Sequence, residues 1–189
     1  SLDLFPEVLW TTDIAGTISK EVSELTGLPI NLPVLVGTAD AAAEAISCGV
    51  STIGDMMMMY GSSNFFIMLT SALRPVEQFW ASNWLDEGST VLSGGMATVG
   101  SLFTWLNNTF PGRSFSEWEA LATTSTIGAN GLVILPYFAG ERTPLFDANA
   151  KGVFFGLQLT TTAGDIYQAM QEAIGFGIKH NLETLALSG

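Results

Sequence analysis

The chain has 189 residues, of which 48% are hydrophobic and only 13% charged, and its formal net charge is -12. Its 18 acidic residues outnumber the 6 basic ones, so too few cations are present for the phosphate-neutralising surface of a nucleic-acid-binding protein, and we expect no nucleic-acid partner. One cysteine, Cys48, excludes an internal disulfide and a multi-cysteine zinc site, and one histidine, His180, excludes a poly-histidine site, so we assign no metal ligand and expect a reducing compartment, the cytoplasm.

The first quarter of the chain predicts a helix, a strand and a second helix. Residues 20–26 have an amphipathic pattern that Gly27 and Pro29 bring to an end, in the order typical of a helix C-terminus. Residues 33–37 are continuously apolar, as in a strand covered on both faces. The alanine-rich residues 41–47 that follow favour a helix.

A β-hairpin is predicted next. Two apolar runs, residues 56–60 and 64–70, flank the loop Gly61-Ser62-Ser63, and a short glycine-containing loop between apolar runs is typical of a hairpin. The four methionines at residues 56–59 have no cysteine or histidine nearby, so we expect a buried strand rather than a soft-metal site.

The rest of the chain alternates strands and helices. We predict strands at residues 90–93, 132–135 and 152–157, and helices at residues 99–108, 114–124 and 165–187. Ser114 and Glu117 have the spacing of a capping box. The last helix carries an apolar stripe made of Ile166, Ala169, Met170, Ala173, Ile174 and Gly177. This alternation indicates an α/β protein with some antiparallel pairing.

Two uncharged stretches raise the question of a membrane span. A spanning helix needs about 20 mostly apolar residues. The first stretch, residues 56–73, is interrupted by the polar loop at 61–64, and the second, residues 88–112, contains several glycines and two adjacent asparagines. We therefore expect no membrane partner.

Two positions could carry chemistry. Asp40 lies where a predicted strand meets a predicted helix, and open α/β sheets bind ligands at that end of their strands. The same position suits a helix cap, made by Asp40 or by Thr38.

The loop Gly61-Ser62-Ser63 could hold an anion with its N–H and O–H groups, although an ordinary turn explains the same composition. Gly94, Gly95 and Gly100 lack the spacing of a nucleotide-binding fingerprint and indicate close backbone packing. His180 lies late in the last helix, and we expect it to face solvent.

The most specific pattern is Leu-Pro-Tyr-Phe-Ala-Gly-Glu-Arg-Thr-Pro at residues 135–144, continued by Ala-Lys-Gly-Val-Phe-Phe-Gly-Leu at 150–157. It runs on at matching spacing to Asp165, Ile166, Ala169, Met170 and Glu172. Further matching segments come before it, at residues 4–8, 15–16, 26–29, 33–40, 61–63 and 94–106. In order, and over nearly the whole chain, these segments resemble the FGGY family of carbohydrate kinases, and within it the xylulokinase-like branch. Gln171 departs from the pattern, which indicates a divergent member.

The resemblance implies two ribonuclease H-like domains of the actin and sugar-kinase superfamily, with mixed sheets and flanking helices. Residues 1–49 would end the N-terminal, sugar-binding domain, and residues 50–189 would begin the C-terminal, ATP-binding domain. Sugar and ATP with Mg²⁺ would meet in a cleft, with Asp40 as catalytic base and sugar contact. Gly61, Ser62 and Ser63 would hold the ATP phosphates, so we expect Asp40 near this loop. The family's magnesium ligand and most sugar contacts are expected before Ser1, and its adenine contacts beyond Gly189.

The function expected from the resemblance is part of an ATP-dependent kinase, a transferase acting on a pentulose or related carbohydrate. The 189-residue chain is expected to be inactive as a fragment. The alternative is a non-catalytic binding or scaffold domain of the same fold. We also expect self-association into a homo-oligomer through the apolar residues 56–59, 65–66 and 154–155.

Overall fold

The computed structural model describes residue 4, residues 6–73 and residues 76–187. Phe5, which is part of the upstream family match, lies outside them. The chain divides into two compact units: a first unit of residues 1–57, 67–74 and 81–92, and a second unit of residues 58–66, 75–80 and 93–189. None of the helices in the described ranges is long and apolar enough to cross a membrane.

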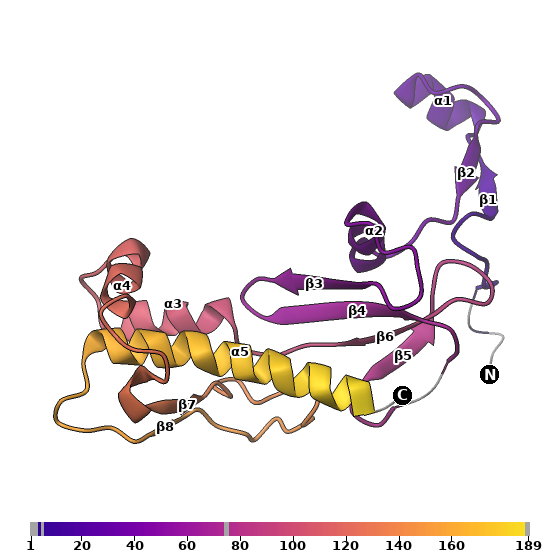
Figure 1. Cartoon of the computed structure of the whole chain (residues 1–189). Helices are drawn as coiled ribbons and strands as arrows, with labels where there is room; N and C mark the ends of the chain where they lie inside the picture. Colours follow the sequence, from indigo (N-terminus) through magenta and orange to yellow (C-terminus); the bar gives the residue numbers. More distant parts are fainter. Residues whose placement is uncertain (1–3, 5, 74–75, 188–189) are drawn as a thin grey trace. The chain divides into compact units, whose positions relative to one another are not determined.

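The first unit opens with a small antiparallel sheet (Figure 1). Strand β1 (Ile14–Thr17) pairs with β2 (Pro33–Leu35), and helix α1 (Lys20–Thr26) connects them. The Ser19 side chain caps the start of α1, and Gly27 ends it with a left-handed φ of 78°. The helix predicted at residues 20–26 is therefore confirmed at both ends, because a short polar cap and a terminal glycine are strong local signals.

The strand predicted at residues 33–37 is shorter than expected and is not covered on both faces. Val34 is 41% exposed and Leu35 54% exposed, and β2 has β1 as its one neighbour in a two-stranded sheet. A continuous apolar run indicates burial only where other elements lie over both faces. Strand β1, with the sequence Ile-Ala-Gly-Thr, was not predicted because four residues give too little alternation to recognise.

A four-stranded sheet follows in the strand order β3-β4-β6-β5, shown in Figure 1. Strands β3 (Met56–Tyr60) and β4 (Asn64–Thr70) have the predicted hairpin bounds, and β6 (Thr90–Gly94) is one residue longer than predicted. Strand β5 (Trp80–Asn83) was missed because Trp-Ala-Ser-Asn lacks an apolar alternation. The boundary between the two units falls within each of these strands.

The expectation of a buried methionine strand is wrong for most of β3. Met57 is 7% exposed, but Met59 is 36% and Tyr60 62% exposed. The physical reason is that β3 is the edge strand of its sheet, whereas the next strand, β4, buries Phe66 completely. Phe155 is 73% exposed, so of the apolar segments expected to self-associate it offers the most accessible aromatic ring, and self-association stays a prediction.

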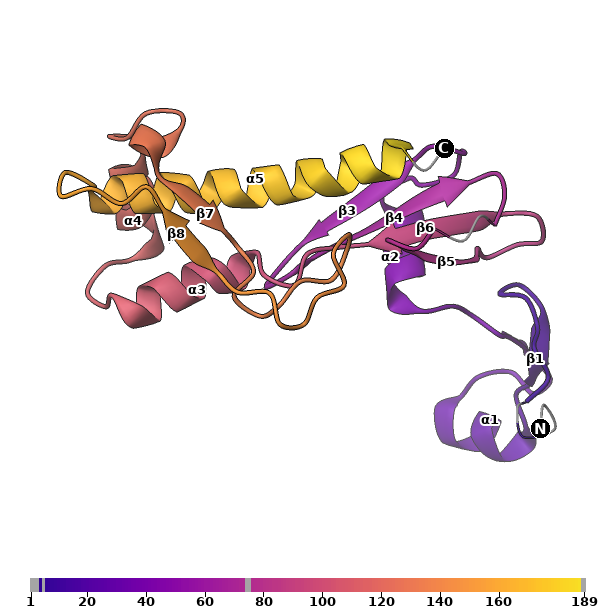
Figure 2. The same ribbon diagram turned by 90° about the horizontal axis from the view of Figure 1, so that it is seen from below.

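The second unit packs helices against a small antiparallel sheet (Figure 2). Strands β7 (Val133–Leu135) and β8 (Val153–Phe155) pair, and helix α5 (Ala163–Leu187) packs against β7 and α4 (Phe115–Ala122). Helix α3 (Gly100–Thr109) and the 3-10 turn η2 (Ala129–Gly131) belong to the same unit. The predicted capping box of Ser114 and Glu117 is present.

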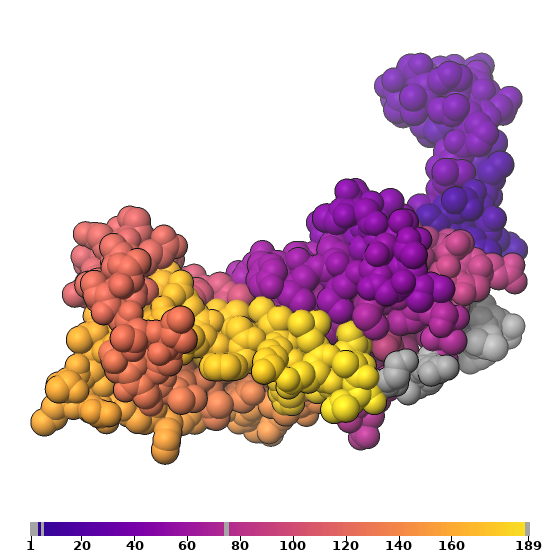
Figure 3. Space-filling view, viewed as in Figure 1, coloured from indigo at the N-terminus to yellow at the C-terminus, as the bar shows by residue number. Residues whose placement is uncertain are grey.

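The core of the second unit includes Ala169, Met170, Ala173 and Ile174 of the predicted α5 stripe, whereas Ile166 and Gly177 are only partly buried. Its buried side chains are Met96, Val99, Leu102, Leu106, Trp118, Ala122, Ala129, Leu132, Ile134, Tyr167, Ala169, Met170, Ala173 and Ile174. The other face of α5, in yellow, is open to solvent in Figure 3. His180 is exposed there as predicted, and Phe176 is 64% exposed.

Candidate functional site

Asp40 is the first residue of helix α2 (Asp40–Ser47). Gly37, three residues before Asp40 and two after the end of β2, has a φ of 77°, a left-handed conformation that suits glycine. The prediction that Asp40 or Thr38 caps this helix is wrong, because Ala39 is the N-cap and makes no side-chain cap bond. Asp40 instead accepts a hydrogen bond from the N–H of Ala41 on its Oδ1 atom, at 2.8 Å.

The Asp40 carboxylate is exposed and only partly engaged. Within the described part of the chain, its Oδ2 atom makes no hydrogen bond. Ala45, one turn along the helix, is completely buried and anchors α2 in the first unit. The helix therefore presents a carboxylate with one oxygen held by the backbone and the other available to accept a proton.

The loop between β3 and β4 forms a tight turn. The N–H of Gly61 donates to the carbonyl of Ser63 at 2.9 Å. Ser62 is exposed and Ser63 half-buried, and among the described residues neither hydroxyl takes part in a hydrogen bond. Two hydroxyl groups are thus available at the tip of the hairpin.

The carbonyls of this loop are bound to the N-terminus of α3. Gly61 O accepts the N–H of Gly100 at 2.9 Å. Ser62 O accepts the N–H groups of Val99 and Ser101, at 3.0 and 3.1 Å, and the Ser101 hydroxyl at 2.8 Å. These bonds consume the first free amides of the helix, so a ligand cannot use them.

The same bonds determine where the loop amides point. A trans peptide places its N–H opposite its C=O. Because the carbonyls of Gly61 and Ser62 face α3, the N–H groups of Ser62 and Ser63 face away from it, on the side left free by the helix. Two successive amides on the same side of a glycine-containing loop are donors of the kind that bind an anion.

Three glycines allow the backbone to pack closely around this loop, as predicted. A Cβ at Gly100 would lie 2.6 Å from Gly61 O, and a Cβ at Gly94 would lie 2.7 Å from Thr143 Oγ1. A Cβ at Gly95 would overlap the backbone of Asn64. At these three positions the absence of a side chain lets the surrounding backbone and side chains approach closely.

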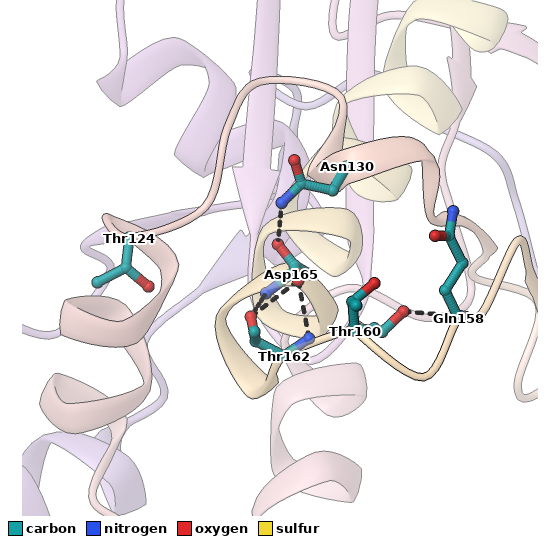
Figure 4. A pocket seen from close by; sticks show the side chains of 7 residues that line it. Thr124, Asn130, Gln158, Thr160, Thr162 and Asp165 are labelled. Carbon is teal, nitrogen blue, oxygen red and sulfur yellow. Dashed lines mark hydrogen bonds between the residues drawn. The ribbon is translucent and has the colours of Figure 1, made fainter.

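A second candidate is a polar cavity of about 320 Å³ at the start of α5, lined by Thr124, Asn130, Gln158, Thr160, Thr161, Thr162 and Asp165 (Figure 4). Asp165 is 3% exposed. Its Oδ1 accepts hydrogen bonds from Ser125 Oγ at 2.5 Å and Asn130 Nδ2 at 2.7 Å. Its Oδ2 accepts the N–H and hydroxyl of Thr162, both at 2.8 Å.

These bonds leave Asp165 saturated. The hydrogen bond from Ser125 first, and then those from Thr162 and Asn130, hold the pKa of the Asp165 carboxyl well below its usual range. The N–H of Asp165 in turn donates to Thr162 Oγ1 at 3.2 Å, which completes a capping box. This capping box was not predicted, although Thr162-Ala-Gly-Asp165 has its spacing. Neighbouring side chains and one backbone amide thus supply every hydrogen bond that the Asp165 carboxylate can readily accept, so its role is structural.

The comparisons with known proteins give the family. Residues 56–189 match the C-terminal domain of the FGGY family of carbohydrate kinases. The chain belongs to this family. It is 29% identical over 192 residues to a xylulose kinase of Staphylococcus epidermidis, covering 99% of this chain and 38% of that protein. It is 30% identical to a ribulokinase of Mycolicibacterium smegmatis, covering 94% of this chain and 34% of that protein.

The fold agrees with that assignment. A crystal structure of xylulose kinase from Rhodospirillum rubrum matches with a TM-score of 0.88 and 32% identity, over 97% of this chain and 38% of that one. The predicted α/β, ribonuclease H-like fold is confirmed. The chain thus spans less than half the length of these relatives. Asp40 belongs to the first unit and the hairpin loop to the second, so the predicted proximity of the two stays a prediction.

Proposed function

We propose that the whole protein that carries this chain transfers the γ-phosphoryl group of ATP to a hydroxyl of a pentulose or a related carbohydrate. The observation that carries the proposal is the Gly61-Ser62-Ser63 loop: the carbonyls of Gly61 and Ser62 bind α3, while the amides and hydroxyls of Ser62 and Ser63 make no hydrogen bond within the described part of the chain. Membership of a sugar-kinase family supports it, and relatives named xylulose kinase and ribulokinase make pentuloses the first substrates to test. Residues 1–49 would end the sugar-binding domain, and residues 50–189 would begin the ATP-binding domain.

The loop residues would bind phosphate oxygens. Ser62 and Ser63 each offer one N–H and one O–H, and donors fixed before the reaction stabilise developing charge without reorganising. Gly61 has no side chain, so a phosphate group could come close to the loop backbone there. In phosphoryl transfer, such positioning and charge stabilisation account for most of the rate.

Asp40 would act as the base. Its free Oδ2 would accept the proton of the attacking sugar hydroxyl as the new oxygen–phosphorus bond forms and the bond to the leaving ADP breaks. Mg²⁺ bound with the nucleotide would supply further positive charge beside the phosphates. Across the described residues, no group of three or more His, Cys, Asp or Glu side chains could hold a metal ion, and no magnesium ligand is assigned to this chain.

The proposal is tested by measuring ADP release from the purified whole protein with ATP, Mg²⁺ and single sugars. The panel contains D-xylulose, D- and L-ribulose, gluconate and glycerol. We expect ADP release that depends on one of the pentuloses, with a phosphorylated sugar as the second product. Nucleotide binding without turnover on any sugar would contradict the proposal and favour a non-catalytic binding domain of the same fold.

A further inference from the structure

The proposed phosphate loop is supported from behind by three consecutive side chains of the second unit. Thr143 Oγ1 accepts the N–H of Gly95 at 2.6 Å, and Arg142 Nη2 donates to Met96 O at 2.7 Å. Glu141 Oε1 accepts the N–H of Ala97 at 2.7 Å. Each side chain of residues 141–143 thus binds the backbone of one residue of 95–97, and the two segments pair in opposite directions.

This segment leads directly to the loop. Residues 95–97 connect β6 to the N-terminus of α3, where the backbone amides of Val99, Gly100 and Ser101 bind the loop carbonyls. A displacement of residues 95–97 would therefore move the groups that hold the loop. The support is continuous from residues 141–143 to Gly61 and Ser62.

Arg142 also reaches the other side of the loop. The same Nη2 atom donates to Asn64 O at 2.8 Å, and Asn64 follows Ser63 directly. The Asn64 N–H donates to Met96 O at 3.0 Å, so the guanidinium closes a ring between the start of β4 and the segment before α3. The Asn64 side chain adds a bond from its Nδ2 to Met59 O at 3.0 Å, on the strand that enters the loop.

Arg142 lies among buried polar groups, some of which lack a hydrogen-bond partner. Glu141 is 5% and Thr143 is 0% exposed. Within the described residues, the buried side-chain polar atoms without a hydrogen-bond partner are Glu141 Oε2 and Arg142 Nε, from residues 141–143, and Thr98 Oγ1, directly after residues 95–97. Burial raises the pKa of the Glu141 carboxyl. Unsatisfied polar atoms cost stability, and proteins tend to keep such local violations at functional sites.

We propose that Arg142 is a positioning residue for the phosphate loop, fixing both flanks of Gly61-Ser62-Ser63 through Asn64 O and Met96 O without itself contacting the nucleotide. The inference rests on the proposed function of the loop. A planar, permanently charged guanidinium suits this place, because one group must donate to two carbonyls in a fixed geometry. Both bonds come from Nη2, whose N–H groups are held in the plane of the guanidinium. Lysine keeps the charge, but the N–H groups of its ammonium rotate.

The test uses Arg142→Met and Arg142→Lys in the whole protein, with Arg113→Met as control. Arg113 is an exposed arginine of the same unit that lies over the Trp118 ring, at 4.9 Å from its centroid. We expect Arg142→Met to raise KM for ATP, and the Kd for ATP measured by calorimetry, at least about 10-fold, because small misplacements of positioning groups are expensive. KM for the sugar should stay within about 2-fold of its wild-type value. Arg142→Lys should recover part of the ATP affinity.

The outcomes separate the inference from the function on which it rests. If wild-type protein turns over a sugar and folded Arg142→Met or Arg142→Lys keeps its ATP KM and Kd, the positioning role is wrong and the proposed function stands. A merely structural role would reduce the active fraction without separating the two KM values, and would also overturn the inference. If Arg142→Met does not fold, the lysine variant decides in the same way. If wild-type protein neither binds ATP nor transfers phosphoryl groups, both proposals fall.

Discussion

The carboxylates of the two candidate sites, Asp40 and Asp165, differ in how many hydrogen bonds each accepts. Asp165 accepts four, from Ser125, Asn130 and Thr162, and is buried. Asp40 is exposed and accepts one, from the next backbone amide. A saturated carboxylate stabilises the fold, whereas one with a free oxygen can take part in proton transfer.

Asp165→Asn should destabilise the protein in a pH-dependent way. Asparagine cannot accept all these bonds, and leaving buried donors unsatisfied costs about 1–3 kcal/mol. The folded-state pKa of Asp165 is lowered from an ordinary value of 3.8, so its contribution is complete above about pH 4 and is lost as pH falls towards the folded-state pKa. Urea unfolding should therefore show a wild-type advantage at pH 7 that shrinks below pH 4.

The matched control is Asp86→Asn, at an exposed aspartate. It should leave the unfolding free energy within about 0.5 kcal/mol of wild type at both pH values. An Asp165→Asn protein as stable as wild type at pH 7, or a difference in unfolding free energy that grows on acidification, would contradict the structural role of Asp165.

The contact between the hairpin and α3 depends on Gly100. A Cβ at this position would lie 2.6 Å from the carbonyl oxygen of Gly61, so Gly100→Ala should push the loop out of place. We expect KM for ATP to rise about 10-fold or more, since positioning errors of about 1 Å can cost up to about 100-fold in rate. The measurement is steady-state kinetics of the whole protein with varied ATP.

Gly175→Ala in α5 is the matched substitution. No atom lies within 4 Å of a Cβ at Gly175, so alanine there should leave KM for ATP unchanged and raise stability by up to about 1 kcal/mol through helix propensity. Equal ATP KM values for the two variants would show that the contact between the loop and α3 does not matter for nucleotide binding.

Local signals in the sequence predicted several elements closely. The hairpin at residues 56–70, the helix at 20–26 and the capping box at Ser114 depend on neighbouring residues, and each is confirmed. Strand β5 was missed because its sequence, Trp-Ala-Ser-Asn, has little strand character without its sheet neighbour. The exposure of β2 could not be predicted, because it depends on which elements cover the strand.

The candidate site was only partly predictable for the same reason. The composition of Gly61-Ser62-Ser63 suggested an anion loop or an ordinary turn, and only the bonds of its carbonyls to residues 99–101 indicate that the amides of Ser62 and Ser63 point away from α3. The support from Arg142 joins residues separated by 46 and 78 positions in the chain. No local pattern encodes contacts between residues so far apart.

At the scale of the whole molecule, the proposed base and the proposed phosphate loop belong to different units. Asp40 lies in the first unit and Gly61, Ser62 and Ser63 in the second. The chain also spans 34 to 38% of the length of the relatives that it matches. Tests of catalysis therefore need the whole protein, and the 189-residue chain alone should show no sugar-dependent turnover.

Whether Asp40 is the base is tested by the turnover number of Asp40→Asn in the whole protein, compared with that of Glu44→Gln. Glu44 is an exposed acid one turn further along α2, so the control removes a charge from the same helix without touching the proposed base. We predict that Asp40→Asn folds, binds ATP and sugar like wild type, and loses about 10²–10⁴-fold in kcat, while Glu44→Gln keeps wild-type kcat. A folded Asp40→Asn protein with near-normal kcat would contradict the account.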